Sequence, residues 1–384
     1  MIYLDNASTT SISPQVLDAM LPFLQDLYGN PGSIHALGRY SAEAVETARE
    51  QIAGFLHAKP EQIIFTSGGT ESNNLAFRSA LYAGSCPRIV TSAVEHDSIR
   101  STLREFLLHS GMNESVVYPD NSGSITAENI RSCFNTLPDL VSVMYMNNET
   151  GAVNEVPEIG ALCRMHGVLF HTDCVQAAGA MELDVNKMYC DFLSLSSHKL
   201  HGPKGVGALF VRDRVTLRPL ICGGADQEFG LRGGTENVAG IVGFGMACEI
   251  AGRDLKANSV HTSTLKQIFW HRLCECLAER NLSDTVRING PAAIKPGKIL
   301  NILADGVDAE TLVLLMDSRG VCISTGSACR SHEQEPSRVL LAMGLTEEQA
   351  HNSVRVSFSD QNTFDEATQA AEIMAQCITF IKAQ

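Results

Sequence analysis

The chain has 384 residues, 44% of them hydrophobic and 19% charged, with a formal net charge of −14. A chain of this length can bury a large core, and we expect it to form two domains. The acidic balance argues against broad non-specific binding of nucleic acid. No stretch has the length and apolar character of a membrane span, and the first residues carry no signal-peptide pattern, so we expect a cytoplasmic protein without membrane contact.

Short apolar runs and helical patterns alternate along the first 255 residues. Strands are predicted at 62–66, 88–93, 140–146, 168–172, 191–195 and 206–211, and helices at 36–56, 71–83, 97–109, 155–166 and 236–252. Strands that alternate with helices are typical of parallel sheets, because each crossover helix returns the chain to the same edge. We therefore predict an α/β fold with a mostly parallel sheet and helices on both faces.

The pattern changes after about residue 255. A long helix from Ser263 to Arg280 is followed by strands near 298–303, 320–323 and 353–358, with a helix between successive strands. This arrangement predicts a smaller α+β domain. We assign residues 14–255 to a large domain, and residues 1–13 and 256–384 to a small domain.

The number and spacing of the cysteines indicate the cellular compartment of the protein. Twelve cysteines are spread along the chain without a Cys-x-x-Cys pair, and many, such as Cys163, Cys190 and Cys248, fall within strand or helix patterns. Reduced intracellular proteins use cysteine in this way to fill cores, whereas disulfide and zinc frameworks need paired spacings. We therefore expect neither a disulfide framework nor a resident metal.

Two predicted strands end in residues that suggest a cofactor. Asp173 follows the apolar run 168–170, and Lys199 follows the run 192–195. Ligands of open α/β sheets bind at this carboxyl edge. Burial lowers the pKa of a lysine, whose neutral amine can form a Schiff base, while an Asp is a partner for a pyridinium nitrogen. The pair suggests pyridoxal phosphate; the alternative is a lysine beside a loop and an Asp that caps a helix.

Three further strand ends carry polar residues. The sequence Gly68-Gly69-Thr70 opens a helix and could hold a phosphate on backbone amides, or it is only a glycine turn that caps the helix. His96 could stack on a flat ring and move protons, or be a structural histidine. Asn148 offers an amide to a ring oxygen or a substrate carboxylate, although asparagine-rich strand ends are also turns. Together these ends point to one cleft with an anion site.

The C-terminal part adds a thiol and a guanidinium. Cys329 follows small residues and precedes polar ones, which predicts an exposed, mobile loop at about 324–336. Arg330 and His332 would favour the thiolate, the nucleophilic form of cysteine. Arg355 lies among apolar residues of a predicted strand, where its guanidinium would suit a substrate α-carboxylate or form an ion pair on the strand face.

Motifs along nearly the whole chain carry a family resemblance. They are Tyr3–Thr10, Tyr28–Pro31, Ser67–Asn73, Glu95-His96, Asn147–Glu149, Asp173 with Gln176, Ser196–Lys199, Arg232–Asn237 and Gly326–Cys329. Together they resemble the cysteine desulfurases of the NifS and IscS type, in the class-V aminotransferase group of fold-type-I pyridoxal-phosphate enzymes. The resemblance implies a large domain with a mostly parallel sheet of the seven-stranded type and a smaller α+β C-terminal domain.

The resemblance also implies roles for the strand-end residues. Lys199 would bind pyridoxal 5′-phosphate through a Schiff base, Asp173 would pair with the ring nitrogen, and Gln176 would bond the phenolic oxygen. His96 would stack on the ring and act in catalysis with Lys199. The residues implied for the phosphate are Gly69, Thr70, Ser196, His198 and, from a second subunit, Thr235.

By the same resemblance, the enzyme removes sulfur from L-cysteine and leaves L-alanine. Asn148 and Arg355 would take the substrate carboxylate, with Asn148 also close to the cofactor. Cys329 would receive the sulfur as a persulfide and pass it to an acceptor protein for iron–sulfur cluster assembly, tRNA thiolation or DNA sulfur modification. A homodimer is implied, without direct nucleic-acid binding and with no metal, although Cys329 could transiently ligate an iron–sulfur cluster. The alternatives are a selenocysteine lyase, a class-V aminotransferase, or a non-catalytic platform for partners.

Three stretches depart from the family pattern. Asn6-Ala7-Ser8-Thr9 stands where Asn-Asn-Ala-Thr is common, Ser359-Asp360 stands where a Gly is usual, and the residues after Cys329 are unusually charged. We expect none of these stretches to touch the residues that hold the cofactor. The charged stretch leaves the identity of the sulfur acceptor open.

Overall fold

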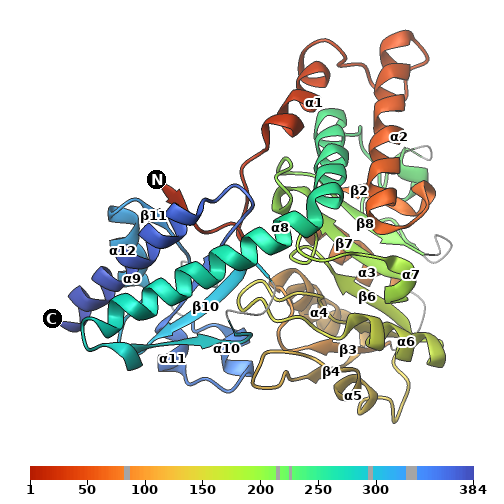
Figure 1. Cartoon of the computed structure of the whole chain (residues 1–384). Coiled ribbons are helices and arrows are strands. Elements are labelled where there is room, and N and C mark those ends of the chain that lie inside the picture. Colours follow the sequence, from red (N-terminus) through yellow and green to blue (C-terminus); the bar gives the residue numbers. More distant parts are fainter. Residues whose placement is uncertain (82–86, 213–216, 225–226, 293–296, 326–334) are drawn as a thin grey trace.

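The structure is a computed structural model that describes residues 1–81, 87–212, 217–224, 227–292, 297–325 and 335–384. Its largest part is a seven-stranded sheet in the order β2-β8-β7-β6-β5-β3-β4 (Figure 1). β8 is antiparallel to both neighbours and the other pairs are parallel, which confirms the predicted mostly parallel sheet. The strands are β2 (Ile63–Thr66), β3 (Arg88–Ser92), β4 (Asn113–Val117), β5 (Leu140–Ser142), β6 (Leu169–Asp173), β7 (Phe192–Ser196) and β8 (Gly207–Val211).

The side chains of the sheet alternate between two apolar layers, because successive residues of a strand point to opposite faces. On one face Ile64 and Phe192 pack with α3, and Ile89 and Leu140 pack with α3 and α4. On the other face Phe65 and Leu193 pack with α2, α6 and the first half of α8 (Val238–Ala278). Helices therefore cover both faces, as predicted. The helices of this part are α1 (Pro14–Gln25), α2 (Ala36–Leu56), α3 (Gly69–Leu81), α4 (Asp97–Ser110), α5 (Ala127–Arg131), α6 (Val156–His166) and α7 (Val185–Met188).

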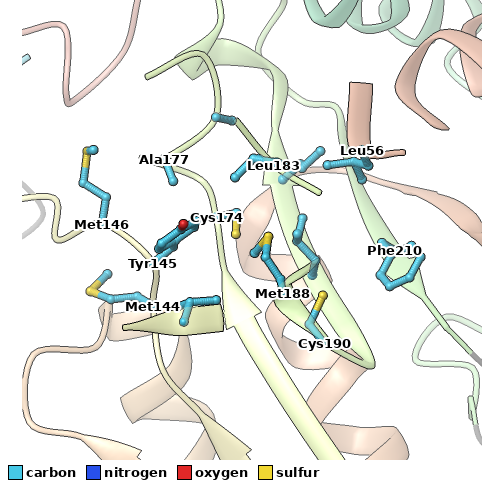
Figure 2. Close-up of a cluster of buried hydrophobic side chains, with 14 of the residues drawn as sticks. Leu56, Met144, Tyr145, Met146, Cys174, Ala177, Leu183, Met188, Cys190 and Phe210 are labelled. Atoms are coloured by element: carbon cyan, nitrogen blue, oxygen red, sulfur yellow. The ribbon is translucent and has the colours of Figure 1, made fainter. Parts of the chain in front are cut away.

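Figure 2 shows part of this core on one face of the sheet. Cys174, Met188 and Cys190 pack there within the larger of the apolar clusters. Cys163, Cys190 and Cys248 are buried and free, so these cysteines fill the core as the sequence predicted. Among the described residues, no helix combines the length and the apolar character needed to cross a bilayer.

One helix departs from the prediction. We predicted separate helices at 236–252 and from Ser263 to Arg280, but α8 (Val238–Ala278) is a single helix of 41 residues. The residues between the predicted helices contain no glycine or proline except Gly252 at the boundary, so the loss of apolar periodicity marks an exposed stretch and not a break. α8 packs on α1 and α2 near its start and on α12 (Phe364–Lys382) near its end (Figure 1).

A second apolar cluster joins the two ends of the chain. Ile2 and Leu4 pack with residues of α8, β10, β12 and α12. β9, β10 and β12 form an antiparallel sheet, and β1 pairs with β11 in parallel. The division of the chain near residue 255 remains a prediction. The elements are β1 (Ile2–Tyr3), β9 (Val286–Asn289), β10 (Ile299–Ala304), α9 (Ala309–Ser318), β11 (Val321–Cys322), α10 (Arg338–Ala342), α11 (Glu347–His351), β12 (Ser353–Ser357) and α12 (Phe364–Lys382).

Candidate active site

One cavity of about 410 Å³ collects most of the predicted site residues. It lies at the carboxyl ends of the parallel strands, where the α/β rule places ligands. Thr235 is exposed and does not line the cavity. Cys329 lies outside the described residues. The predicted residues that line the cavity are Gly69, Thr70, His96, Asn148, Asp173, Gln176, Ser196, His198, Lys199 and Arg355.

Asp173 is the last residue of β6, and its carboxylate is buried and oriented by two donors. The backbone N–H of Val175 donates to Oδ1 at 2.9 Å, and Asn73 Nδ2 donates to Oδ2 at 2.8 Å. A carboxylate held in this way can pair with a protonated ring nitrogen. Asn73 belongs to a motif noted in the sequence, but no sequence pattern indicated this contact.

Lys199 ends a short 3₁₀ turn, Ser197–Lys199, that follows β7. Its Nζ donates to the carbonyl oxygens of Ala7 and Ser8, at 2.6 Å each, and Gln176 Nε2 donates to the same Ala7 oxygen at 2.8 Å. The N-terminal segment thus crosses the strand ends and contacts Lys199. Our expectation that the unusual stretch 6–9 stays away from the cofactor residues is wrong, because backbone carbonyls make these contacts whatever the side chain.

The start of α3 has the features of an anion site. Two glycines precede Thr70, and a Cβ at Gly69 would come within 2.6 Å of Val175 Cγ2, so only glycine fits this cradle. The exposed amides of a helix N-terminus attract negative charge. Burial opposes ionisation of Glu71 nearby, but hydrogen bonds from Arg232 and Ser67 outweigh it and lower the pKa of Glu71. The Glu71 carboxylate is therefore already paired.

His198 completes this end of the cavity as a neutral group. Burial, with Lys199 and Lys204 nearby, lowers the pKa of His198 to about 4. Its Nδ1 lies 3.1 Å from Thr9 Oγ1. A neutral imidazole of this kind can offer a hydrogen bond to an anion but adds no charge.

His96 is the N-cap of α4, and its Nδ1 accepts from the backbone N–H of Ser98 at 3.1 Å. Glu95 precedes it and is 4% exposed. Burial raises the pKa of the Glu95 carboxyl to about 8, although Ser92 Oγ and the Met144 N–H donate to its Oε1. The sequence motif contained Glu95, but nothing in the pattern indicated a carboxyl that keeps its proton near neutral pH.

Arg355 reaches the cavity from β12 and is 2% exposed. Its Nη1 donates to the Asn148 carbonyl at 2.9 Å, and its Nη2 donates to Asp5 Oδ1 at 2.8 Å and to Ser8 Oγ at 2.6 Å. The ion pair that the sequence analysis gave as the alternative role of Arg355 is present, and its partner is Asp5. The guanidinium is also placed beside the cavity, where a carboxylate could meet it.

Two contacts between residues that line the cavity were missed because they join distant segments. Ser337 Oγ donates to Glu149 Oε2, and Arg338 forms an ion pair with Asp97. Ser337 and Arg338 lie at the start of α10, which packs on the core of the large sheet through Val339. These contacts fix the chain shortly after the predicted cysteine loop.

Comparisons with known proteins show the family of this chain. The class-V aminotransferase family model matches residues 2–369. The chain is 39% identical to the cysteine desulfurase IscS of Clostridium botulinum (strain Hall), over 98% of this chain and 94% of that protein. It is similar to the solved structure of a NifS-like protein (TM-score 0.89, 31% identity, 99% of both chains) and to SspA in complex with cysteine (TM-score 0.80, 32% identity, 94% of this chain and 100% of that one). The chain therefore belongs to the class-V aminotransferase family, in its cysteine desulfurase group.

Proposed function

We propose that this protein is a cysteine desulfurase that takes sulfur from L-cysteine, leaves L-alanine and carries the sulfur as a persulfide on Cys329. The observation that carries the proposal is the cavity, which combines an amine, a carboxylate, an imidazole, a helix N-terminus and a guanidinium in a chain 39% identical to a cysteine desulfurase. The exchange balances without an oxidant or reductant, because cysteine and the Cys329 thiol together give alanine and a persulfide.

The cavity fits pyridoxal 5′-phosphate, on which enzymes of this family depend. Gly69, Thr70, Ser196 and His198 would hold the phosphate at the start of α3, since their amides, hydroxyls and imidazole suit an anion. Asp173 would face the ring nitrogen. When bound, the cofactor supplies an electron sink for charge that develops on the substrate carbons.

The remaining residues would bind and orient the reactants. Lys199 would supply the amine that holds the cofactor aldehyde, and Gln176 has a second amide hydrogen for the phenolic oxygen besides the one given to Ala7. Arg355 and Asn148 would take the substrate carboxylate, and His96 would stack on the ring and move protons at its imidazole.

We also infer a homodimer. α1 exposes Leu17, Leu21 and Leu24 along one side, with exposed fractions of 43%, 38% and 58%, and Tyr28 and Ile34 after it are 73% and 92% exposed. Contiguous apolar surface of this kind is typical of an interface, and a two-fold interface is the commonest way to cover it. Thr235, which is exposed in this chain, would then reach the phosphate site of the partner.

The persulfide would pass to an acceptor protein in the cytoplasm. Iron–sulfur cluster assembly, tRNA thiolation and DNA sulfur modification are the candidate pathways, and Cys329 could transiently ligate a cluster in the first. The charged residues after Cys329 would contribute to recognition of the acceptor.

The experiment that tests the proposal compares wild type with Cys329→Ala for release of alanine and sulfide from L-cysteine. Cofactor binding should be unchanged, because the residues that would hold the cofactor are elsewhere. Alanine production should fall by roughly two orders of magnitude or more, since water does not replace a positioned thiolate. Full alanine production in the variant would move the assignment to a selenocysteine lyase or aminotransferase, and no turnover in the wild type would favour a non-catalytic platform.

A further inference from the structure

Four polar groups form a continuous hydrogen-bonded path along one wall of the cavity. Asn73 Nδ2 donates to Asp173 Oδ2 and to Ser98 Oγ, at 2.8 Å each, and Ser98 Oγ lies 2.8 Å from His96 Nδ1. Asn73 is 1% exposed and Ser98 is 8% exposed, and both line the cavity. The path joins the Asp173 carboxylate to the His96 imidazole through Asn73 and Ser98. The proposed mechanism gives neither of these two linking residues a role.

The chemistry of the partners sets the direction of each hydrogen bond. A carboxylate oxygen only accepts, so Asn73 must turn its amide nitrogen toward Asp173. The second hydrogen of that nitrogen goes to Ser98 Oγ. The single hydroxyl hydrogen of Ser98 is then the one that points to His96 Nδ1.

His96 Nδ1 also accepts from the backbone N–H of Ser98 at 3.1 Å. A ring nitrogen that accepts two hydrogen bonds carries no hydrogen itself, so the neutral imidazole has its proton on Nε2. The path therefore determines which nitrogen of His96 can give up a proton.

The amide of Asn73 has an unfavourable feature that this path explains. Its Oδ1 is buried and has no hydrogen-bond partner among the described residues. An unpaired buried acceptor is unfavourable, and an amide placed for stability alone would satisfy both of its ends. Asn73 instead uses both hydrogens of its nitrogen for Asp173 and Ser98.

We propose that Asn73 and Ser98 are positioning residues that orient Asp173 and hold His96 in the Nε2-protonated tautomer. An imidazole held in the correct tautomer can exchange its proton without first rotating or relocating it, which is how orienting groups raise kcat in other acid–base sites. The consequence for turnover rests on the proposed function. The tautomer itself is a property of the protein without cofactor.

The first measurement is ¹⁵N NMR of the histidine rings in apoprotein, with the His96 signals assigned from their loss in His96→Gln. Wild type should show Nε2 protonated and Nδ1 unprotonated. Ser98→Ala should move the Nδ1 signal and populate the Nδ1-protonated tautomer, because the stronger of its two donors is gone. Ser98→Thr, which keeps the hydroxyl, should restore the wild-type signals.

The second measurement is steady-state turnover of L-cysteine by the loaded enzyme. Ser98→Ala should lower kcat by about 10- to 100-fold, within the contribution of a positioned acid–base group, with little change in KM. Ser79→Ala is the matched control, since Ser79 is also a buried serine but its hydroxyl contacts Leu75 and Arg218 and does not line the cavity. It should leave both the ring signals and kcat unchanged.

Unchanged His96 signals in Ser98→Ala would overturn the proposal, whatever the activity. If that variant does not fold, Asn73→Leu removes the other link and is read in the same way. If the ring signals change as expected while wild type forms no alanine, the positioning role stands and the proposed function fails, so the two outcomes are distinguishable.

Discussion

Replacing Glu95 by glutamine should remove a strong pH dependence from the stability of this protein. Glu95 is 4% exposed. Burial raises the pKa of its carboxyl from 4.5 to about 8, and the nearby Asp173 adds to the shift, while hydrogen bonds from Ser92 and Met144 oppose it. The folded protein therefore keeps a proton that the unfolded chain releases.

The sign and the size of the effect follow from this difference. The contribution of Glu95 to stability is complete below pH 4.5 and is lost as the pH rises to about 8. Within that window the free energy of unfolding falls by about 1.4 kcal/mol for each pH unit, because the folded state binds one more proton than the unfolded state. Glutamine retains an oxygen for Ser92 and Met144 but has no proton to titrate.

The assay is urea unfolding of wild-type and Glu95→Gln apoprotein at one protein concentration and a series of pH values. Over about two pH units inside the window, the difference in free energy of unfolding should move by roughly 3 kcal/mol in favour of the variant. Glu95→Leu is the matched control. Like Glu95→Gln, it should lack the pH dependence that Glu95 gives to the wild type. Its free energy of unfolding should be lower than that of Glu95→Gln at every pH, because leucine leaves the donors of Ser92 and Met144 unpaired. If the difference in free energy of unfolding between wild type and each variant does not change with pH, the reasoning is refuted, since Glu95 would then be ionised in the folded protein.

Three further predictions concern the cofactor, the substrate and the assembly. Lys199→Ala should abolish covalent capture of pyridoxal phosphate, and borohydride reduction with peptide mapping of the wild type should place the label on Lys199; a label on Lys204 would contradict the assignment. Arg355→Gln should raise KM for L-cysteine by roughly 10- to 100-fold, because a charge-assisted contact worth about 1.5–3 kcal/mol is lost, and an unchanged KM would exclude Arg355 from the substrate site. Light scattering should give a homodimer, and a monomer that still binds cofactor would disprove the shared site that Thr235 implies.

The sheet was predictable where its strands are buried. β6 and β7 are buried, and the apolar runs at their starts lead into Asp173 and Lys199, which is why the sequence alone places these two residues at one edge. β4 was missed because it is an edge strand in which only Val117 is buried, so its sequence lacks the apolar signal. The long helix α8 was divided for a related reason, because exposure interrupts apolar periodicity without interrupting the helix.

The site was predictable only where the type of side chain indicates its chemistry. Lysine, aspartate, histidine and arginine at strand ends suggest chemistry by type. The contacts of Lys199 with the carbonyls of Ala7 and Ser8 leave no trace in the sequence, because every residue has a carbonyl and the partners are more than 190 positions apart. Asn73 and Ser98 were missed for another reason: their importance depends on rotamers and on the direction of each hydrogen bond.

Ser8 shows how contacts that the sequence did not indicate connect Lys199 with Arg355. Its carbonyl accepts from Lys199 Nζ, while its hydroxyl accepts from Arg355 Nη2 and donates to Asp5. Asp5 and Arg355 belong to the part of the chain around β12, whereas Lys199 belongs to the large sheet. A carboxylate that binds Arg355 competes with Asp5 and Ser8 for the same Nη2 hydrogens. A carboxylate bound at the guanidinium would therefore act on the segment that also holds the lysine amine, because Ser8 links Arg355 at one end of the cavity to Lys199 at the other.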